Sequence, residues 1–388
     1  MDTVKYGIIG IGNMGSAHTQ FISQLKNCVL TAVCDINPEA FDRIPENARP
    51  KNLQKFTDAD TFFAEGDMDA VIIAVPHYFH PDMALRALAA GKHIIVEKPI
   101  AVHKNEAMRL IEGAKKYPNL IKSAMFNQRT HTAHKKIKHL IDSRELGTLR
   151  RVNWTITDWF RSQCYYDSGD WRASWRGEGG GVLLNQCPHQ LDLFQWFFGM
   201  PAKVRAFAFF GKYHDIEVED EVNAYLEYAN GMTANFIAST SEIPGTNRLE
   251  IVGDRGRLVF EDGKIEFKRS EQDARIFSKE TEMRFGIPDI WNCTIPGGMN
   301  PNQHRDIIEN VADAILTGKP LIAPMEEGIN ALELGNAMML SAWMDKTIEL
   351  PMNGDDYAAR LAKLVETSRY PEKVVKPATA GEDFSKSF

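Results

Sequence analysis

The motif Gly10-Ile11-Gly12-Asn13-Met14-Gly15 is the feature that most restricts how this 388-residue chain can fold. It follows the apolar run 4–9 directly and opens a helix-like stretch. Asp35 ends the next apolar run, 20 residues beyond Gly15. A strand, a glycine turn, a helix and a distant acid in this order are the fingerprint of a dinucleotide-binding unit, whereas a glycine triplet alone predicts only a turn.

Each glycine of the motif has a separate expected task. Gly10 permits the tight turn, Gly12 lets the backbone approach a pyrophosphate, and Gly15 lets the helix pack closely on the strand. The amides at the start of the helix, at Asn13 and Met14, are expected to hold the anion. The alternative is a purely structural glycine turn.

Asp35 predicts which dinucleotide binds. Its carboxylate can accept hydrogen bonds from a ribose 2′-hydroxyl and would repel a 2′-phosphate. No arginine follows it directly, and the nearest one is Arg43. The sequence therefore favours NAD over NADP as the cofactor.

The first 125 residues alternate short apolar runs with amphipathic stretches. This rhythm predicts repeated βαβ units, and runs that are apolar on both faces, such as 71–75, predict a parallel sheet covered on both sides. Strands are expected at 4–10, 29–35, 69–75, 92–97 and 119–126, with helices at 14–26, 80–90 and 104–117.

After about residue 150 the apolar pattern changes to alternation with a period of two. Turn signals such as Asn230-Gly231 and Asp262-Gly263 join several of these stretches, so an antiparallel sheet is expected, with helices at 189–198, 302–317 and 326–345. The predicted class is α/β, with a Rossmann domain over 1–125. An α+β domain with an open, mostly antiparallel sheet is predicted over 126–370, followed by a loosely packed tail over 371–388.

Composition narrows the classes of protein. With 45 basic and 52 acidic residues the net charge is −7, and no long basic block suggests a nucleic-acid partner. Five scattered cysteines without a CxxC pair suggest reduced thiols. With no leader pattern or span-length apolar window, we expect a cytoplasmic protein without a membrane partner. The histidine pairs at 77 and 80 and at 131 and 134 have a spacing seen in metal sites, but we expect no metal because no further ligand completes either set.

Two further segments are candidates for chemistry. Lys98, in Glu97-Lys98-Pro99, follows the strand predicted over 92–97, and ligands bind at the carboxyl ends of open parallel strands. The glycine-rich block 179–189 leads through Asn185 and Pro188 to His189 at the start of a predicted helix.

With these segments in view, the sequence resembles the Gfo/Idh/MocA family of glucose-fructose oxidoreductase, inositol dehydrogenase and MocA-like proteins. The similarity covers most of the chain and lies in the glycine motif, Asp35, the PHYFHP segment 76–81, Glu97-Lys98-Pro99, the segment 126–129 and the block 179–196. It implies reversible NAD(P)-dependent oxidation of a sugar or cyclitol hydroxyl. It also implies a homo-oligomer, a dimer or tetramer, formed through the C-terminal sheet.

The resemblance also assigns residues. Lys98 and His189 correspond to the family's catalytic lysine and histidine. An imidazole with a pKa near 7 suits a base for the hydroxyl proton, and a lysine suits stabilisation of the alkoxide. The resemblance places further residues at the cofactor, namely Pro76, His77, His80, Glu97, Lys98 and Asn127. His304 is expected at the substrate, with a helix-start histidine as the alternative.

Position 185 departs from the family pattern. Many members have aspartate where this chain has Asn185. An amide can orient a hydroxyl but cannot carry charge, so we assign Asn185 to substrate binding.

The segment 159–176 combines aromatic, arginine and polar side chains ahead of the catalytic block. Aromatic faces pack on the C–H faces of sugar rings and arginines bind hydroxyls, so a carbohydrate site is predicted here, with a packed interface loop as the alternative. The candidates are Arg161, Tyr165, Trp171, Arg172 and Trp175.

The predicted function is NAD-dependent oxidation of a secondary hydroxyl of a sugar, a glycoside, for which C3 is one specific position, or a cyclitol such as inositol. Two alternatives remain. One is a glycosidase with tightly bound NAD that works by transient oxidation and elimination. The other is a non-catalytic NAD-binding regulator.

Overall fold

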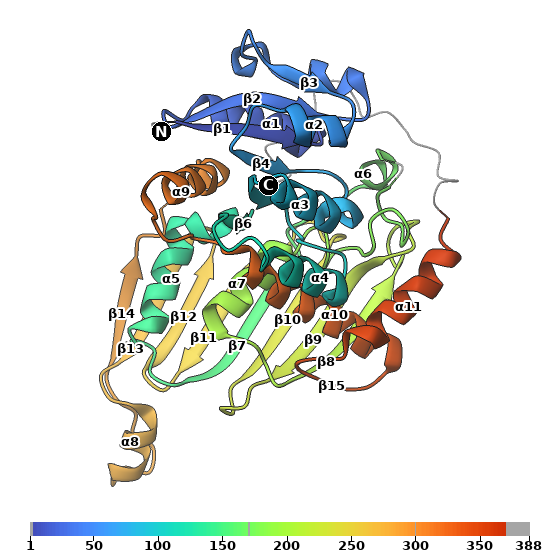
Figure 1. Ribbon diagram of the computed structural model, residues 1–388. Coiled ribbons are helices and arrows are strands. Elements are labelled where there is room, and N and C mark those ends of the chain that lie inside the picture. The colour runs from blue at the N-terminus through green and yellow to red at the C-terminus, as the bar shows by residue number, and fades with distance from the viewer. Residues whose placement is uncertain (1–2, 170, 299, 370–388) are drawn as a thin grey trace.

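The computed structural model describes residues 3–169, 171–298 and 300–369. The predicted tail 371–388 lies outside these residues. Two sheets organise the described chain, a six-stranded parallel sheet from the first third and a nine-stranded, mostly antiparallel sheet from the rest (Figure 1). This confirms the predicted fold class.

The first sheet has the strand order β3-β2-β1-β4-β5-β6, the doubly wound order of dinucleotide-binding folds. Its strands are β1 (Val4–Ile9), β2 (Cys28–Cys34), β3 (Gln54–Phe56), β4 (Ala70–Ile73), β5 (His93–Val96) and β6 (Lys122–Ala124). The helices between them are α1 (Asn13–Ser23), α2 (Ala59–Glu65), α3 (His80–Ala89) and α4 (Lys104–Ala114). All four residues of β4 are 0% exposed, which explains why this strand is apolar on both faces.

The second sheet has the order β14-β13-β12-β11-β7-β10-β9-β8-β15. Its strands are β7 (Leu149–Ile156), β8 (Lys203–Phe210), β9 (Glu219–Glu227), β10 (Thr233–Ser239), β11 (Asn247–Gly253), β12 (Gly256–Glu261), β13 (Lys264–Ser270), β14 (Ile290–Ile295) and β15 (Ile348–Glu349). Strands β7 and β10 pair in parallel and the other neighbours are antiparallel.

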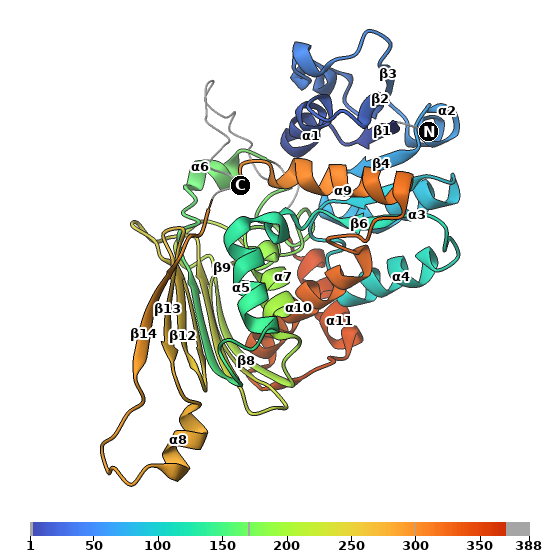
Figure 2. The same cartoon turned by 90° about the vertical axis from the view of Figure 1, so that its left-hand side faces the viewer.

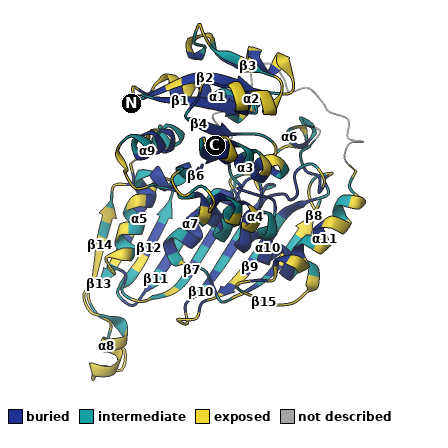
Figure 3. Cartoon of the chain, viewed as in Figure 1, coloured by how far each residue is buried: buried dark blue, intermediate teal, exposed yellow. Residues whose placement is uncertain are grey.

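Helices cover one face of this sheet (Figure 2). The helices of the second half are α5 (Thr132–Asp142), α6 (Gln163–Asp167), α7 (Pro188–Phe198), α8 (Ala274–Glu280), α9 (Gln303–Thr317), α10 (Gly328–Met344) and α11 (Gly354–Glu366). In Figure 2, α5, α7 and α10 lie on the covered face. Side chains alternate accordingly along β7, where Val152, Trp154 and Ile156 are buried, so one face forms the core and the other stays open (Figure 3).

Helix α9 joins the two halves. It follows β14 of the second sheet in sequence but packs with α1 and β1, and the Tyr6 hydroxyl donates to the Ile308 carbonyl at 3.0 Å. The amide of Ala124, in β6, donates to the Ala323 carbonyl at 3.0 Å. These contacts hold the carboxyl ends of the parallel strands against the second half of the chain.

A buried ion pair braces the same boundary. Nε and Nη2 of Arg129 donate to the two oxygens of Asp192 on α7, at 2.8 and 2.6 Å, and its Nη1 donates to Glu327 at 2.5 Å. Arg129 and Asp192 are each 1% exposed, so loss of either partner would leave an uncompensated buried charge.

Candidate active site

The glycine turn after β1 has the geometry that a dinucleotide needs. Gly10 has a φ of +90°, and a Cβ on Gly15 would lie 1.9 Å from the Gly10 carbonyl oxygen. A Cβ on Gly12 would meet nothing within 4 Å, so the backbone at Gly12 faces open space. Helix α1 starts next to Gly12 with no acidic residue in its first turn and no side-chain cap among the described residues, which leaves the amides of Asn13 and Met14 for an anion.

Asp35 lies beside this turn. Its Oδ2 accepts from the Ile11 amide at 2.7 Å and its Oδ1 accepts from the Asn37 amide at 2.9 Å. The carboxylate is half-buried, so its remaining lone pairs can accept hydroxyl protons. Arg43 is near the turn, because its carbonyl oxygen accepts from the Ser16 hydroxyl at 2.6 Å.

Lys98 follows β5 and reaches across to the second half of the chain. Its Nζ donates to the Asn185 carbonyl at 3.0 Å. Burial lowers the pKa of Lys98, and the carboxylates of Glu97 and Glu178 oppose that effect. The contact brings together two residues that are 87 positions apart in the sequence.

Glu97 forms a buried pair with His18 of α1. Its Oε1 lies 2.6 Å from His18 Nε2, and its Oε2 accepts from the Lys98 amide at 3.1 Å. Burial opposes ionisation of Glu97, but the hydrogen bond and charge of His18 outweigh it and lower the pKa of Glu97 to about 2. Glu97 therefore contributes a fixed negative charge next to Lys98.

His189 begins α7 directly after Pro188, as the sequence predicts. Its ring packs edge-on to Phe126, and its Nδ1 is buried without a hydrogen-bond partner among the described residues. Burial, and then the charges on Lys98 and His304, hold the pKa of His189 well below its usual value. The imidazole is thus neutral at physiological pH, and its titration lies lower than the value near 7 expected from the sequence.

Asn185 lies between Lys98 and the segment 159–176, which carries Arg161 and Arg172 and is called the arginine-rich segment below. Besides accepting from Lys98 through its carbonyl, it donates from Nδ2 to Oε1 of Glu178 and to the Tyr165 hydroxyl at 3.4 Å. Glu178 was not singled out in the sequence. Its only sequence signal is its position just before the three glycines 179–181.

The segment 159–176 brings most of its predicted substrate residues together. The Tyr165 hydroxyl accepts from Arg172 Nη1 at 2.8 Å and from Gln186 Nε2 at 3.3 Å. The guanidinium of Arg161 lies 5.0 Å from the centre of the Tyr165 ring, and that of Arg172 lies 4.6 Å from the Trp171 ring. Aromatic faces and cationic groups are therefore adjacent to Asn185.

Trp175 does not belong to this group. It is 5% exposed and packs against Trp343 and Phe210, while its carbonyl accepts from the Tyr78 hydroxyl at 2.6 Å. Its ring fills the core, so the expected contact with a substrate is not supported by its position.

His304 lies on the cofactor side. Its ring stacks on Phe21 of α1 with centroids 5.3 Å apart, and its Nδ1 lies 3.4 Å from Nδ2 of Asn127. Burial, followed by the charge on His18, lowers the pKa of His304 to about 4. The structure thus groups His304 with Asn127, Glu97 and His18 rather than with the arginine-rich segment.

The two histidines of the segment 76–81 have different surroundings. Both ring nitrogens of His80 lie 2.7 Å from backbone carbonyls, those of Pro99 and Val75, so neither nitrogen is left for a cofactor. His77 packs edge-on to Trp171, and its Nδ1 lies 3.3 Å from the Glu178 carbonyl, next to Pro76. His77 thus contacts the segment 171–178, whereas His80 lies against Pro99, the residue after Lys98.

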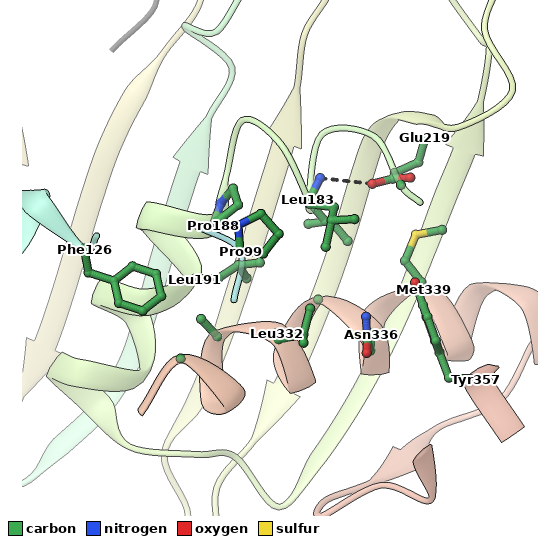
Figure 4. A pocket seen from close by; sticks show the side chains of 15 residues that line it. Pro99, Phe126, Leu183, Pro188, Leu191, Glu219, Leu332, Asn336, Met339 and Tyr357 are labelled. Atoms are coloured by element: carbon green, nitrogen blue, oxygen red, sulfur yellow. Dashed lines mark hydrogen bonds between the residues drawn. The ribbon is translucent and has the colours of Figure 1, made fainter. Parts of the chain in front are cut away.

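An interior cavity lies between the glycine-rich block 179–189 and helix α10 (Figure 4). It leaves about 20 Å³ for the centre of a water molecule, enough for roughly one water. Glu219 lines it and accepts from the amides of Gly181 and Leu183, and burial raises the pKa of Glu219 to about 7. The cavity is too small to hold a sugar.

The described residues hold no group of three histidine, cysteine or acidic side chains placed to bind a metal. His134 instead bonds the Gln128 carbonyl at 2.9 Å, and His131 caps α5. Within the same residues, no helix is long and apolar enough to span a bilayer.

Comparison with known protein families identifies the family of both halves of the chain. Residues 4–124 match the oxidoreductase family with an NAD-binding Rossmann fold, and residues 134–259 match the GFO/IDH/MocA C-terminal domain. The chain belongs to the Gfo/Idh/MocA family. Its NAD-binding fold agrees with the open backbone at Gly12, with Asp35, and with two buried atoms that lack partners among the described residues, Asn127 Oδ1 and His189 Nδ1.

Curated relatives of this Gfo/Idh/MocA protein include dehydrogenases of different substrates. Levoglucosan dehydrogenase of Pseudarthrobacter phenanthrenivorans is 26% identical over 317 residues, which cover 71% of this chain and 80% of that protein. Myo-inositol 2-dehydrogenase of Thermotoga maritima is 24% identical over 66% of this chain and 74% of that protein. A glycosyl hydrolase family 109 protein of Shewanella pealeana is 26% identical, but the match spans only 47% of this chain and 42% of that protein.

Solved structures confirm the fold. The WlbA dehydrogenase of Chromobacterium violaceum, in complex with NADH and UDP-GlcNAcA, superimposes with a TM-score of 0.79 at 23% identity over 91% of this chain and 97% of that one. Levoglucosan dehydrogenase in complex with NADH and L-sorbose gives a TM-score of 0.76 at 21% identity over 91% and 100%.

Proposed function

We propose that this protein oxidises a secondary hydroxyl of a sugar, a glycoside or a cyclitol such as inositol, with NAD as its cofactor. The observation that carries the proposal is the contact of Lys98 Nζ with the Asn185 carbonyl, four residues before the neutral imidazole of His189. The charge of Lys98 also acts on His189, which supports a site where a lysine and a base lie near each other between the two halves of the chain.

The residues divide the chemistry of alcohol oxidation. Nε2 of His189 takes the proton of the substrate hydroxyl, and Nζ of Lys98 stabilises the developing alkoxide. Bound NAD would supply the acceptor for the hydride of the carbinol carbon. Its pyrophosphate would be held by the Gly10–Gly15 turn and its ribose by Asp35, with Asn127, Pro76, His77 and Glu97 towards its reactive end.

The substrate would lie against Asn185, Arg161, Tyr165, Trp171 and Arg172. Rings and guanidinium groups alternate there, an arrangement that suits sugar C–H faces and hydroxyls. The relatives that act on levoglucosan and myo-inositol support a polyol substrate. Among sugar hydroxyls we propose the glucose C3 position as the first to test.

One test is a panel of glucosides, free sugars and inositols with NAD⁺ and with NADP⁺, followed by absorbance of the reduced cofactor. We expect NADH formation with at least one member and a higher kcat/KM with NAD⁺. No reduction with any of them would support a non-catalytic NAD-binding regulator instead.

The second candidate is a glycosidase with retained NAD, and the partial match to glycosyl hydrolase family 109 proteins is its support. In that reaction C3 is oxidised, the acidified C2 proton leaves, the aglycone is eliminated, and water addition and re-reduction restore the sugar. Release of nitrophenol from a nitrophenyl glycoside without net NADH would identify this activity.

The open face of the second sheet is proposed to join copies of the chain into a dimer or tetramer. Outward-facing aromatic side chains on β8 and β9 support it, since Phe207, Phe209 and Tyr225 are 54%, 41% and 42% exposed.

A further inference from the structure

The buried carboxylate of Glu178 contacts the side chain of Asn185. Glu178 is 2% exposed, and its Oε2 accepts from the Ala173 amide at 2.6 Å while its Oε1 accepts from Asn185 Nδ2. Its backbone carbonyl also lies 3.3 Å from Nδ1 of His77. Glu178 is therefore held from both sides, with one oxygen directed at the carboxamide of Asn185.

This contact orients the carboxamide. Nδ2 of Asn185 donates to Glu178 and, at 3.4 Å, to the Tyr165 hydroxyl. Among the described residues no donor contacts Oδ1 of Asn185. The carboxamide thus keeps its oxygen available to accept a hydrogen bond from a ligand hydroxyl, because an amide nitrogen bound to a carboxylate cannot rotate away without leaving a buried charge unsatisfied.

The charge of Glu178 also reaches Lys98. Burial lowers the pKa of Lys98, and Glu178 is one of two carboxylates that counter this effect. Nine charged or titratable groups act on Lys98 or feel its charge, namely Glu97, Glu178, Arg161, Arg172, His77, His80, Cys187, His189 and His304. Because Glu97 is already paired with His18, Glu178 is the carboxylate on the substrate side of this group.

We propose that Glu178 is a positioning residue, which supplies through Asn185 the negative charge that an aspartate at position 185 would carry directly. Glu178 fixes the Asn185 carboxamide towards the substrate hydroxyl and helps to keep Lys98 protonated. The proposal rests on the proposed dehydrogenase function for its catalytic consequence, although the effect on Lys98 can be measured without turnover.

The experiment compares three variants of the full chain: Glu178→Gln, Asn185→Asp and the double variant Glu178→Gln/Asn185→Asp. Glu178→Gln removes the negative charge of Glu178 while it nearly keeps the shape of the side chain. The double variant moves that negative charge to position 185. Glu217→Gln is the matched control, because Glu217 accepts from the Trp175 amide at 3.1 Å in the same segment and is not part of the site.

Two quantities are measured against pH. One is kcat for the best substrate of the panel, and the other is the rate of Lys98 labelling by acetic anhydride, followed by mass spectrometry of the apo protein. For Glu178→Gln we expect kcat to fall about 10-fold, less than the ~10²–10⁴ that a positioned proton-transfer group contributes, because Glu178 acts through Asn185. We also expect the midpoint of Lys98 labelling to move to lower pH.

The double variant should recover most of kcat and return the labelling midpoint towards the wild-type value, whereas Glu217→Gln should change neither. Wild-type values in Glu178→Gln, or a loss that Asn185→Asp does not relieve, would refute the proposal. If Glu178→Gln does not fold, the double variant decides, because it exchanges the carboxylate and the carboxamide across the same contact: wild-type values of kcat and of the labelling midpoint support the proposal, and a loss of both refutes it. A wild-type protein that oxidises no member of the panel refutes the dehydrogenase function. The labelling midpoint of Lys98 still shows in that case whether the charge of Glu178 acts on Lys98.

Discussion

At the scale of single residues, Lys98 affects the protonation of His189. They come from opposite halves of the chain, and the charge on Lys98 helps to lower the pKa of His189. The charge of Lys98 therefore favours a neutral base at His189, while Glu97 and Glu178 oppose the lowering of the Lys98 pKa by burial. Perturbed groups of this kind cluster at functional sites.

Replacement of Lys98 by alanine is expected to lower kcat by at least ~10²-fold, because the cation stabilises an alkoxide that exists mainly in the transition state. NAD affinity, measured by fluorescence titration, should change little. Lys92→Ala is a suitable control, since Lys92 donates to the Met68 carbonyl at the other end of β5. A variant at position 98 that keeps kcat would remove Lys98 from the mechanism.

The pH profile should identify His189 as the base. Only neutral imidazole accepts the hydroxyl proton, so log kcat/KM for oxidation should be flat above the pKa and fall with unit slope below it. The structure lowers this pKa, so the acidic limb should lie below about 6.5, the ordinary value for histidine. In His189→Ala this limb should vanish. An unchanged limb would assign the base to another group, such as Tyr165.

Asp35→Ala should weaken NAD binding and narrow or reverse the preference over NADP, because a hydroxyl acceptor and a negative charge are both lost. Ratios of kcat/KM for the two cofactors measure the effect. Arg43 lies beside the turn, so the double variant Asp35→Ala/Arg43→Ala shows whether this arginine supports any gain in NADP use. Unchanged ratios would place the discriminating contact elsewhere.

At the scale of elements, most strands and helices follow from local patterns, and the exceptions have identifiable causes. Strand β3 has three residues, too few for a periodicity. Strand β14 pairs only with β13 at the sheet edge and leaves most side chains exposed, so no alternation marks it. Helix α8 buries none of its residues and therefore carries no apolar stripe.

The turn from β1 to α1 allows a paired test of element packing. In Gly15→Ala the new Cβ would meet the Gly10 carbonyl, a backbone atom, so we expect a loss of about 1–3 kcal/mol or more in the free energy of unfolding. In Gly12→Ala the Cβ meets no protein atom, so apo stability should stay within ~0.5 kcal/mol while NAD binding weakens. Urea unfolding and NAD titration measure both. Equal stability losses would contradict this division of roles.

At the scale of the whole molecule, the covered and open faces of the second sheet have different tasks. The covered face builds the core with α7 and α10, whereas the open face carries exposed aromatic side chains such as Phe207 and Phe209. Another exposed apolar residue lies on the segment 271–289, which joins β13 to β14 and contains α8. We call this segment the arm, and its Phe285 is 97% exposed.

If the open face joins copies, Phe207→Glu/Phe209→Glu should lower the oligomeric mass, because like charges would meet across a symmetric contact. Light scattering after size-exclusion chromatography measures it. Phe285→Glu, on the arm, is the comparison variant and should leave the mass unchanged. The opposite pattern would assign the contact to the arm, and a wild-type monomer would end the proposal.

The sequence by itself determined the dinucleotide-binding unit, because its strand, glycine turn, helix and acid are neighbours whose geometry is local. It also placed Lys98 at a strand end and His189 at a helix start. The tertiary structure alone decided that Trp175 lies in the core, that His304 stacks on Phe21 and that Glu178 contacts Asn185. These outcomes depend on how distant segments pack, and no pattern within one segment records the neighbours that packing supplies.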